Sequence, residues 1–285
     1  MLLNSLIESY SFEGHSFYLK RDDQIHKEFS GNKARKFYHF LQNEFPYITK
    51  IVSYGSAQSN AMYSLSVLAK MRGWKFEYYV DHIAEYLKEN PHGNYAGALT
   101  NGMQLFVGQA LPSPANNILL IEEGGRQKES ACGIKLLSEE IINWKKENKI
   151  DVLNVFLPSG TGTTALFLQK YLGVNQVFTT PCVGDKDYLK EQFLELERDE
   201  LHHPSILSLE KKYHFGKLYP DNYKIWLKLQ KEIGVEFDLL YDPLGWRVLL
   251  AHPELFSKPL LYIHQGGVLG NESMLPRYKR KYPSI

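Results

Sequence analysis

Residues 30–37 read SGNKARKF and place three cations, Lys33, Arg35 and Lys36, within four positions. The segment follows a Ser-Gly-Asn turn and predicts the first turn of a helix, where cations oppose the helix dipole at a cost of about 0.3–1 kcal/mol each. A lysine in such a setting is of chemical interest because its neutral amine can form a Schiff base with an aldehyde. A single lysine is more often a solvated charge, so Lys33 needs supporting groups before it becomes a candidate nucleophile.

A second candidate is the loop LPSGTGTT at residues 157–164, between a predicted strand and a predicted helix. Its backbone N–H groups and hydroxyls would bind an anion at the start of the helix. Gly160, Gly162 and Ala165 match the dinucleotide pattern G-x-G-x-x-A, but the next strand ends in Thr-Thr-Pro rather than in the expected acid. A single phosphate held by residues 159–164 fits better, and a glycine-rich turn that binds nothing is the alternative.

A third polar segment, SYGSAQSNA at residues 53–61, also follows a predicted strand and opens a predicted helix. Ser56, Gln58, Ser59 and Asn60 offer donors and acceptors at a helix start, where a carboxylate or another anionic group would be favoured. The alternative is that one of these side chains only caps its own helix.

Residues 262–267, YIHQGG, form another strand end with a glycine pair. Taken alone, His264 is more consistent with a hydrogen-bonded histidine of the core than with a catalytic group. No set of His, Cys, Asp or Glu has the spacing of metal ligands, so we predict no metal. No G-x-S-x-G elbow of a serine hydrolase is present.

Together these segments predict a site for pyridoxal 5'-phosphate. The lysine would hold the aldehyde of the cofactor, and the glycine–threonine loop would hold its phosphate. The Ser-Gln-Ser-Asn helix start would face the carboxylate of an amino-acid substrate.

Composition excludes several other classes of protein. The chain has 285 residues, of which 44% are hydrophobic, so one large domain or two ordinary ones can bury a sizeable core. Its 33 Lys and Arg balance 32 Asp and Glu, which argues against a nucleic-acid binder that works through bulk charge. Cys132 and Cys182 fit no disulfide framework, and the N-terminus lacks the basic region of a signal peptide. No apolar stretch approaches the roughly 20 residues of a membrane span. We expect a soluble, cytoplasmic protein without a nucleic-acid or membrane partner.

Short apolar runs alternate with helix-length segments along most of the chain. Strands are predicted at residues 50–54, 75–80, 103–107, 116–125, 175–184 and 258–267 and at the start of 151–173. Helices are predicted at residues 57–73, 95–101, 128–148 and 221–234 and in the second half of 151–173. Repeated strand–helix units predict mostly parallel sheets with helices on both faces. Because no linker is apparent, we expect two intimately packed lobes.

The chain resembles the 1-aminocyclopropane-1-carboxylate deaminase and D-cysteine desulfhydrase family. The resemblance is carried, in chain order, by SGNKARKF, SYGSAQSN, GN at 93–94, EEGG at 122–125, SGTGTT, YDP at 241–243 and HQGG. It extends from about residue 15 to about residue 270. Members of this family are fold-type II pyridoxal-phosphate enzymes related to the tryptophan synthase β chain. The resemblance therefore implies two open, twisted, mostly parallel-sheet lobes with the cofactor between them, and a homodimer.

The resemblance also implies roles for the matching residues. Lys33 becomes the Schiff-base lysine and the carrier of the proton at the substrate's Cα, so as an imine it brings no full ammonium charge to the helix start. Asn60 becomes the partner of the cofactor's 3-oxygen. Gln58 and Ser59, with Ser56 beside them, face the substrate carboxylate, and Ser59 also inherits a catalytic role. The residues that would hold the phosphate are Ser159, Gly160, Thr161, Gly162, Thr163 and Thr164.

The chain departs from the family pattern near residue 242. The family usually reads D-P-V-Y followed by Thr or Glu, whereas residues 242–246 are Asp-Pro-Leu-Gly-Trp. Gly245 takes the position of a tyrosine on the catalytic face. Trp246 takes the position that approaches the pyridine nitrogen, where its indole N–H could only donate. Gln265 stands where Thr is common, near the same ring face. These changes weaken the case for cyclopropane opening and favour a desulfhydrase-like elimination.

We therefore expect a larger cofactor-binding domain from residues 1–36 and 135–285, and a smaller inserted α/β domain from residues 37–134. The expected activity is a lyase or deaminase reaction on a small amino acid, with D-cysteine as the first candidate substrate and with release of ammonia and a 2-oxo acid. The alternatives are an aminocyclopropane-carboxylate deaminase and a homologue that binds the cofactor with little turnover. A dinucleotide-binding oxidoreductase is disfavoured by the missing strand-end acid.

Overall fold

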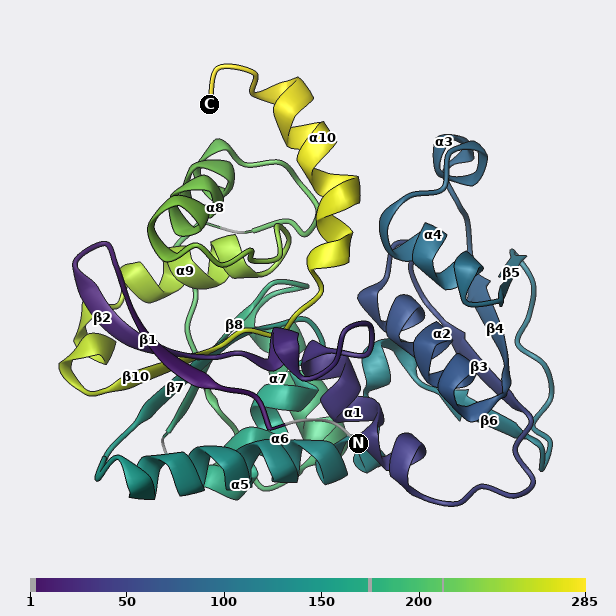
Figure 1. The fold of residues 1–285 in the computed structure, drawn as a ribbon, viewed down its shortest axis with the longest axis horizontal. Coiled ribbons are helices and arrows are strands. Elements are labelled where there is room, and N and C mark those ends of the chain that lie inside the picture. Colours follow the sequence, from purple (N-terminus) through teal and green to yellow (C-terminus); the bar gives the residue numbers. More distant parts are fainter. Residues whose placement is uncertain (1–3, 174–175, 212) are drawn as a thin grey trace.

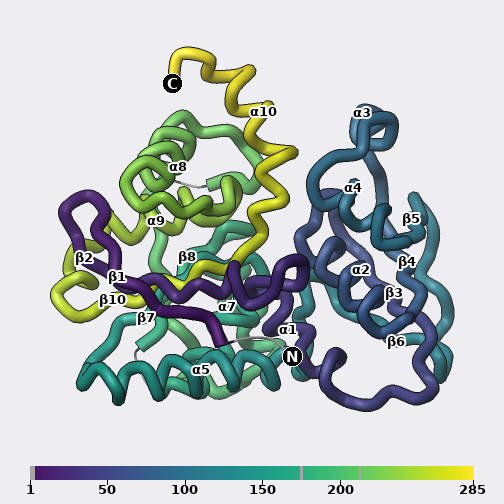
Figure 2. Tube along the Cα trace, in the orientation of Figure 1, coloured from purple at the N-terminus to yellow at the C-terminus, as the bar shows by residue number. Residues whose placement is uncertain are grey.

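The computed structural model describes residues 4–173, 176–211 and 213–285. Figure 1 shows two lobes, each built around its own sheet, with helix α1 (Gly31–Gln42) between them. The chain path in Figure 2 begins in the larger lobe, enters the smaller lobe after α1, and returns to the larger lobe before α5 (Ala131–Glu147). Within the described ranges, no helix is both long enough and apolar enough to cross a membrane.

The larger lobe contains a six-stranded sheet in the order β1-β2-β10-β7-β8-β9. Its strands are β1 (Ile7–Phe12), β2 (His15–Lys20), β7 (Asn154–Ser159), β8 (Val177–Pro181), β9 (Ser205–Ile206) and β10 (Leu260–Ile263). The pairing of β1 with β2 is antiparallel, and the remaining pairings in the order are parallel. Because β7 and β10 are parallel neighbours, the loops that follow them emerge at the same edge of the sheet.

The smaller lobe contains a four-stranded parallel sheet in the order β5-β4-β3-β6. Its strands are β3 (Lys50–Tyr54), β4 (Lys75–Val80), β5 (Met103–Val107) and β6 (Ile118–Ile121). The register pairs Tyr54 of β3 with Tyr79 of β4, so the carboxyl ends of these strands also lie together.

Helices cover both sheets (Figure 1). The smaller lobe carries α2 (Asn60–Arg72), α3 (Glu85–Glu89) and α4 (Gly93–Thr100). The larger lobe carries α5, α6 (Thr163–Leu172), α7 (Lys186–Leu196), α8 (Pro220–Ile233), α9 (Asp242–Leu250) and α10 (Asn271–Lys281). Short 3-10 helices are η1 (Asp22–Gln24), η2 (Glu123–Gly125), η3 (Lys128–Ser130), η4 (Glu200–His202), η5 (Pro253–Ser257) and η6 (Val268–Gly270).

Three main clusters of buried apolar side chains hold these layers together. One lies between α8, α9 and the larger sheet and includes Trp246 and Tyr262, whose rings stack with centroids 4.8 Å apart. A second joins α1 and α2 to the smaller sheet. A third packs α5 and α6 against the larger sheet. The hydrophobic surface that these clusters remove from water provides the main drive for folding.

Helix α2 (Asn60–Arg72) lies within the helix predicted at 57–73, and each of its ends has a capping residue. The side chain of Ser59 accepts a hydrogen bond from the backbone N–H of Ala61 and so caps the first turn. Gly73 ends the helix in the left-handed conformation, with φ of 70°, which costs a glycine little.

The start of α1 lies directly against the turn that follows β10. Gly31 has φ of +65°, and a Cβ there would lie only 1.9 Å from the carbonyl oxygen of Gln265. Only glycine allows this approach, and the backbone N–H of Asn32 donates to the same carbonyl oxygen over 3.0 Å. The contact fixes the position of Lys33, two residues further along α1.

The expected two-lobed, mostly parallel α/β fold is confirmed. The predicted strands at 50–54, 75–80 and 103–107 coincide with β3, β4 and β5. The predicted strand at 175–184 corresponds to β8, although residue 175 lies outside the described residues.

The elements that were not predicted include the β1–β2 hairpin, α3, β9, α9 and α10. The predicted domain boundary at residues 36 and 37 falls inside α1. The domain limits therefore remain predictions.

Candidate active site

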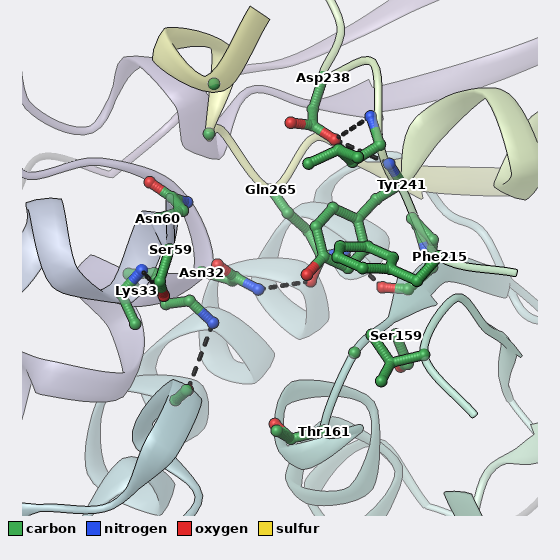
Figure 3. A pocket seen from close by; sticks show the side chains of 18 of the residues that line it. Asn32, Lys33, Ser59, Asn60, Ser159, Thr161, Phe215, Asp238, Tyr241 and Gln265 are labelled. Carbon is green, nitrogen blue, oxygen red and sulfur yellow. Dashed lines mark hydrogen bonds between the residues drawn. The ribbon is translucent and has the colours of Figure 1, made fainter. Parts of the chain in front are cut away.

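A pocket of about 430 Å³ is lined by residues of both lobes. Its walls come from the start of α1, the start of α2, the loop after β7 and the turn after β10. Each of these segments comes after a strand of one of the two sheets. In open α/β sheets, ligands bind beyond the carboxyl ends of the parallel strands. The segments that the sequence analysis identified therefore meet at one pocket, which Figure 3 shows from close by.

Lys33 extends from the first turn of α1 into this pocket, where its Nζ lies 3.3 Å from the carbonyl oxygen of Gly124. Desolvation lowers the pKa of this lysine from 10.5 to about 8, and the nearby carboxylate of Glu123 partly opposes the change. The neutral form of the amine, which a nucleophile or a base requires, is therefore more abundant near neutral pH than in an ordinary lysine, at roughly a tenth of the molecules.

Lys36, one helical turn after Lys33, is buried and also lines the pocket. Its Nζ donates to the carbonyl oxygen of Gly124 over 3.0 Å and to Oγ1 of Thr161 over 3.1 Å. Desolvation, followed by the charges of Lys33 and Arg126, lowers its pKa well below the ordinary value. An anion bound beside it would restore the charge. The sequence motif contains this lysine, but nothing in the pattern indicated that it faces the site.

The loop from Ser159 to Thr164 forms a cradle at the start of α6, and its residues all line the pocket. Oγ of Ser159 lies 2.6 Å from Oγ1 of Thr179, and Oγ1 of Thr161 lies 3.1 Å from Oγ1 of Thr163. Within the described residues, the buried hydroxyl of Thr164 has no hydrogen-bond partner. Such a group costs free energy until a ligand satisfies it.

Gly162 gives the cradle its shape. Its φ is +70°, and a Cβ there would lie 2.4 Å from the ring of Phe193 and 2.6 Å from Leu189. A side chain at this position would meet both strain and a clash. The loop therefore turns tightly, and the helix dipole and the free N–H groups of the first turn of α6 favour an anion.

The start of α2 brings Ser56, Gln58, Ser59 and Asn60 to the same pocket. Two of these side chains also have structural partners: Oγ of Ser56 accepts from the backbone N–H of Gln58, and Oγ of Ser59 accepts from that of Ala61. Each serine hydroxyl still has its proton to donate. The same geometry therefore allows these serines to cap the local backbone and also to bind a ligand.

Gln265 lines the pocket and connects the start of α1 to the end of β7. Its Nε2 donates to the carbonyl oxygen of Pro158 over 2.6 Å, and its Oε1 accepts from Nδ2 of Asn32 over 3.0 Å. The neighbouring His264 is fully buried, with Nε2 2.7 Å from the carbonyl oxygen of Glu236 and Nδ1 accepting from the backbone N–H of Gly266. The interpretation of His264 as a hydrogen-bonded core histidine is confirmed.

The placement of Trp246 beside the cofactor is wrong. Its side chain is fully buried in the core of the larger lobe, stacked on Tyr262, and it does not line the pocket. The reason lies in α9, whose residues at 245 and 246 face the sheet. A Cβ at Gly245 would lie 2.9 Å from the hydroxyl of Tyr262 and 3.3 Å from Cβ of Pro158, so no tyrosine fits there.

Another tyrosine does reach the pocket. Tyr241 precedes Gly245 by one helical turn, and its hydroxyl lies 3.4 Å from where a Cβ of Gly160 would stand. Burial raises the pKa of its phenol well above the ordinary value, so it is protonated at neutral pH. Its ring lies beside that of Phe215. Tyr241 belongs to the YDP motif at 241–243, but nothing in that motif indicated that its ring faces the site.

Asp238 is a further pocket residue that the sequence did not indicate. Its Oδ1 accepts from the backbone N–H groups of Leu240 and Tyr241, each over 2.7 Å. Burial raises its pKa to about 7 despite these two bonds. Burial and the charge of Asp238 raise the pKa of the adjacent Asp242 to about 8. No periodic pattern distinguishes such a carboxylate from a surface one.

No protein-family model matches the chain. Over 194 residues the chain is 23% identical to a curated protein of Oryza sativa subsp. japonica, named putative D-cysteine desulfhydrase 2, mitochondrial. That match covers 60% of this chain and 47% of the rice protein, so the chain spans about half the length of the curated relative.

Solved structures match almost the whole chain. An ACC deaminase homologue has a TM-score of 0.78 at 21% identity and covers 98% of this chain and 94% of its own. A hydrogen sulfide-producing enzyme from Fusobacterium nucleatum has a TM-score of 0.66 at 11% identity and covers 94% and 97%. A threonine deaminase of T.th. has a TM-score of 0.66 at 13% identity and covers 93% and 92%. The fold of this chain is thus that of the fold-type II pyridoxal-phosphate enzymes, and its similarity to a D-cysteine desulfhydrase, first indicated by the sequence motifs, is confirmed.

Proposed function

We propose that this chain is a pyridoxal-phosphate-dependent lyase or deaminase that acts on a small amino acid. D-cysteine is the first candidate substrate, with hydrogen sulfide, ammonia and a 2-oxo acid as products. The names of the similar proteins, a D-cysteine desulfhydrase, an ACC deaminase homologue and a hydrogen sulfide-producing enzyme, support this choice.

One observation carries the proposal: the amine of Lys33 lines the same pocket as the hydroxyl of Thr164, which has no partner in the described part of the chain. The first can bind an aldehyde, and the second lies in a cradle suited to a phosphate. Lys36 adds a buried amine that already bonds to the cradle residue Thr161 and that a bound phosphate would keep charged. The residues present therefore fit a ligand that carries both an aldehyde and a phosphate, as pyridoxal phosphate does.

In this proposal Lys33 holds the cofactor aldehyde, and residues 159–164 hold the phosphate. Asn60 is proposed as the partner of the 3-oxygen and Gln265 as a polar group beside the ring, since both side chains line the pocket. Once bound, the cofactor supplies an electron sink for the negative charge that develops at the substrate's Cα.

The side chains of the protein would move the proton, orient the substrate and shield it from water. Nζ of Lys33, in the neutral form that its lowered pKa favours, takes the proton from Cα. Ser59, Gln58 and Ser56 orient the substrate carboxylate at the start of α2, where the helix dipole favours negative charge. Both lobes contribute to the wall, so the reacting atoms are partly shielded from water.

A second candidate is opening of an aminocyclopropane carboxylate. The phenol of Tyr241 is the observation in its favour, because it supplies a protonated tyrosine within the pocket although residue 245 is glycine. The third candidate is a homologue that binds the cofactor with little turnover. One experiment distinguishes the three candidates.

The test is the visible absorption spectrum of the protein after loading with pyridoxal phosphate, followed by a substrate screen. We expect a yellow protein, loss of the visible band in Lys33→Ala, and an unchanged band in Lys70→Ala, a control lysine on the outer end of α2 that does not line the pocket. Sulfide release from D-cysteine supports the first candidate. Formation of 2-oxobutyrate from aminocyclopropane carboxylate supports the second.

A yellow protein that releases neither sulfide nor 2-oxo acid from any amino acid in the panel would leave the third candidate. A protein whose spectrum is unaffected by Lys33→Ala would contradict the proposal. We also propose a cytoplasmic homodimer, as the family resemblance implies, and light scattering of the purified protein tests the dimer.

A further inference from the structure

Two basic and two acidic side chains form a cluster of charges around the first turns of α1. They are Lys20 at the end of β2, Asp22 in η1, Arg35 in α1 and Glu140 in α5. The first three residues are each at most 2% exposed, and the side chain of Glu140 is 16% exposed. None of these four residues lines the pocket.

Arg35 is the centre of this charged cluster, because its guanidinium forms two bonds to each carboxylate. Nε and Nη2 donate to the two oxygens of Asp22 over 3.0 and 2.8 Å, and Nη1 and Nη2 donate to the two oxygens of Glu140, each over 2.7 Å. Nζ of Lys20 lies 2.7 Å from Oε2 of Glu140, and Oγ of Ser5 donates to Oδ1 of Asp22 over 2.6 Å. A planar guanidinium that is bound on two sides in this way has one orientation.

The buried charges of the cluster are a costly way to stabilise a helix. Desolvation acts to raise the pKa of the Asp22 carboxyl, and the charge and hydrogen bonds of Arg35 outweigh this effect, so the pKa lies below the ordinary value. Apolar side chains of similar volume often replace a buried ion pair without loss of stability. Stability alone therefore gives little reason for the cluster, whereas the defined geometry of its bonds gives one.

The charged cluster determines which way α1 faces. Successive residues of a helix are about 100° apart, so the side chains of Lys33 and Arg35 leave the helix about 200° apart. Arg35 points into the cluster, whereas Lys33 and Lys36 point into the pocket. The contact between Gly31 and the turn after β10 holds only the first residues of α1. The guanidinium of Arg35 fixes the rotation of the helix beyond that end.

The backbone of α1 is held at the same place. A Cβ at Gly133, in the first turn of α5, would lie 2.1 Å from the carbonyl oxygen of Arg35 and 2.7 Å from Cβ of Tyr38. Helix α5 therefore lies directly against α1, and only a glycine allows this approach. Glu140 follows Gly133 by two helical turns, so one helix supplies both the close contact and a counter-ion for Arg35.

We propose that Arg35, held by Asp22 and Glu140, is a positioning residue for Lys33: the charged cluster sets the rotation of α1 and so directs the amine toward the cofactor aldehyde. The inference rests on the proposed function and concerns residues that line no part of the pocket. A covalent bond requires the amine at one distance and one angle, whereas the attraction of a phosphate tolerates a small displacement. Damage to the cluster should therefore weaken the bond to Lys33 more than it weakens the binding of phosphate to residues 159–164.

The test compares two ligands of the cofactor-free protein, pyridoxal phosphate and pyridoxine phosphate. They share the ring and the phosphate, but the first has an aldehyde where the second has an alcohol. Only the aldehyde can form a Schiff base with Lys33, so the ratio of the two dissociation constants isolates that bond. Titration followed by protein fluorescence measures both constants, and urea unfolding measures the stability of each variant. In the parent protein we expect pyridoxal phosphate to bind more tightly.

Two variants disturb the cluster in different ways. Arg35→Lys keeps the positive charge but loses the planar arrangement of donors, and Glu140→Gln keeps the shape of the side chain but loses a counter-charge. In both variants we expect the preference for pyridoxal phosphate to fall about tenfold, because the amine is displaced from its bonding position.

The matched control is Glu77→Gln in β4. The carboxylate of Glu77 lies 2.6 Å from Nζ of Lys50, and its side chain is 11% exposed, which is close to the exposure of Glu140. Neither residue of this pair lines the pocket or belongs to α1. The control should lose stability as Glu140→Gln does but keep the preference for pyridoxal phosphate.

A fall of the preference in either cluster variant that the control does not share supports the positioning role. An unchanged preference in both, or an equal fall in Glu77→Gln, would overturn it and leave the cofactor proposal intact. If Arg35→Lys does not fold, Glu140→Gln decides alone, because it leaves Arg35 bound to Asp22. Equal affinities in the parent protein, with no visible absorption band, would instead overturn the proposed function, so the two failures are distinguishable.

Discussion

Lys33 and Lys36 donate to the same acceptor, the carbonyl oxygen of Gly124, over 3.3 and 3.0 Å. One helical turn separates the two lysines, so both amines reach the pocket from the same face of α1. Burial lowers the pKa of each, and the charge of Lys33 lowers that of Lys36 further. The two lysines therefore differ in role. The amine of Lys33 is available for covalent chemistry, and Lys36 links the α1 face of the pocket to the cradle through Thr161.

Lys36→Met should retain the visible absorption band of the loaded protein but bind pyridoxal phosphate about tenfold more weakly, because a buried partner of the cradle and a cation beside the phosphate are lost. The dissociation constant is measured by titration of the cofactor-free protein. Lys70→Met, on the outer end of α2, is the control and should bind normally. Normal affinity in Lys36→Met would limit Lys36 to a structural role.

Thr164→Val should weaken cofactor binding and slightly stabilise the cofactor-free protein. The hydroxyl of Thr164 is buried without a partner among the described residues, so the isosteric methyl group removes a destabilising polar group when the pocket is empty. With phosphate present, the loss of one charge-assisted hydrogen bond should cost about 1.5–3 kcal/mol of binding free energy.

The matched control for this variant is Thr179→Val. Oγ1 of Thr179 bonds to Ser159 and to the carbonyl oxygen of Leu157, so its loss should destabilise both forms of the protein. Urea unfolding with and without the cofactor separates the two patterns. Equal cofactor affinity in Thr164→Val and the parent protein would remove Thr164 from the site.

Trp246→Phe should reduce the free energy of unfolding by about 1–3 kcal/mol and leave the absorption spectrum of the loaded protein unchanged. The indole packs against Tyr262 and Phe17 in the core, and its N–H has no partner among the described residues. A normal unfolding free energy combined with a shifted cofactor spectrum would instead place Trp246 at the ring, as the family pattern implied.

Asp238→Asn should reduce the dependence of stability on pH. The folded-state pKa of Asp238 is raised to about 7 from 3.8, so the folded protein binds more protons than the unfolded chain between these values. The contribution of Asp238 to stability is therefore complete below about pH 4 and is lost as the pH rises through about 7. From about pH 5 to about pH 8, the free energy of unfolding should fall less in Asp238→Asn than in the parent protein.

Urea unfolding at both pH values, at the same cofactor concentration, measures this difference. The pKa of Asp242, raised to about 8 by burial and by the charge of Asp238, should also fall in Asp238→Asn, and this fall reduces the pH dependence of the variant further. Parallel pH curves for the two proteins would show that Asp238 titrates normally.

The sequence by itself determined the fold class and indicated the residues that are proposed to carry the main chemistry. Hydrophobic runs of strand length were sufficient to place β3, β4 and β5, because glycine or polar residues flank all three strands and β3 and β4 are largely buried. The motifs around Lys33, Ser59 and residues 159–164 could be read because turns, caps and anion cradles are local properties of a few successive residues.

Only the tertiary structure showed which residues from other parts of the chain complete the wall of the pocket. Tyr241, Asp238 and Asn94 belong to segments distant in sequence from Lys33, and their chemistry follows from burial and from the partners that long-range packing supplies. The same packing turned residues 245 and 246 toward the sheet, where Tyr262 leaves no room for a side chain at Gly245. The direction in which a helix faces is set by the apolar surface it covers, and that surface is not encoded in the four or five residues of a motif.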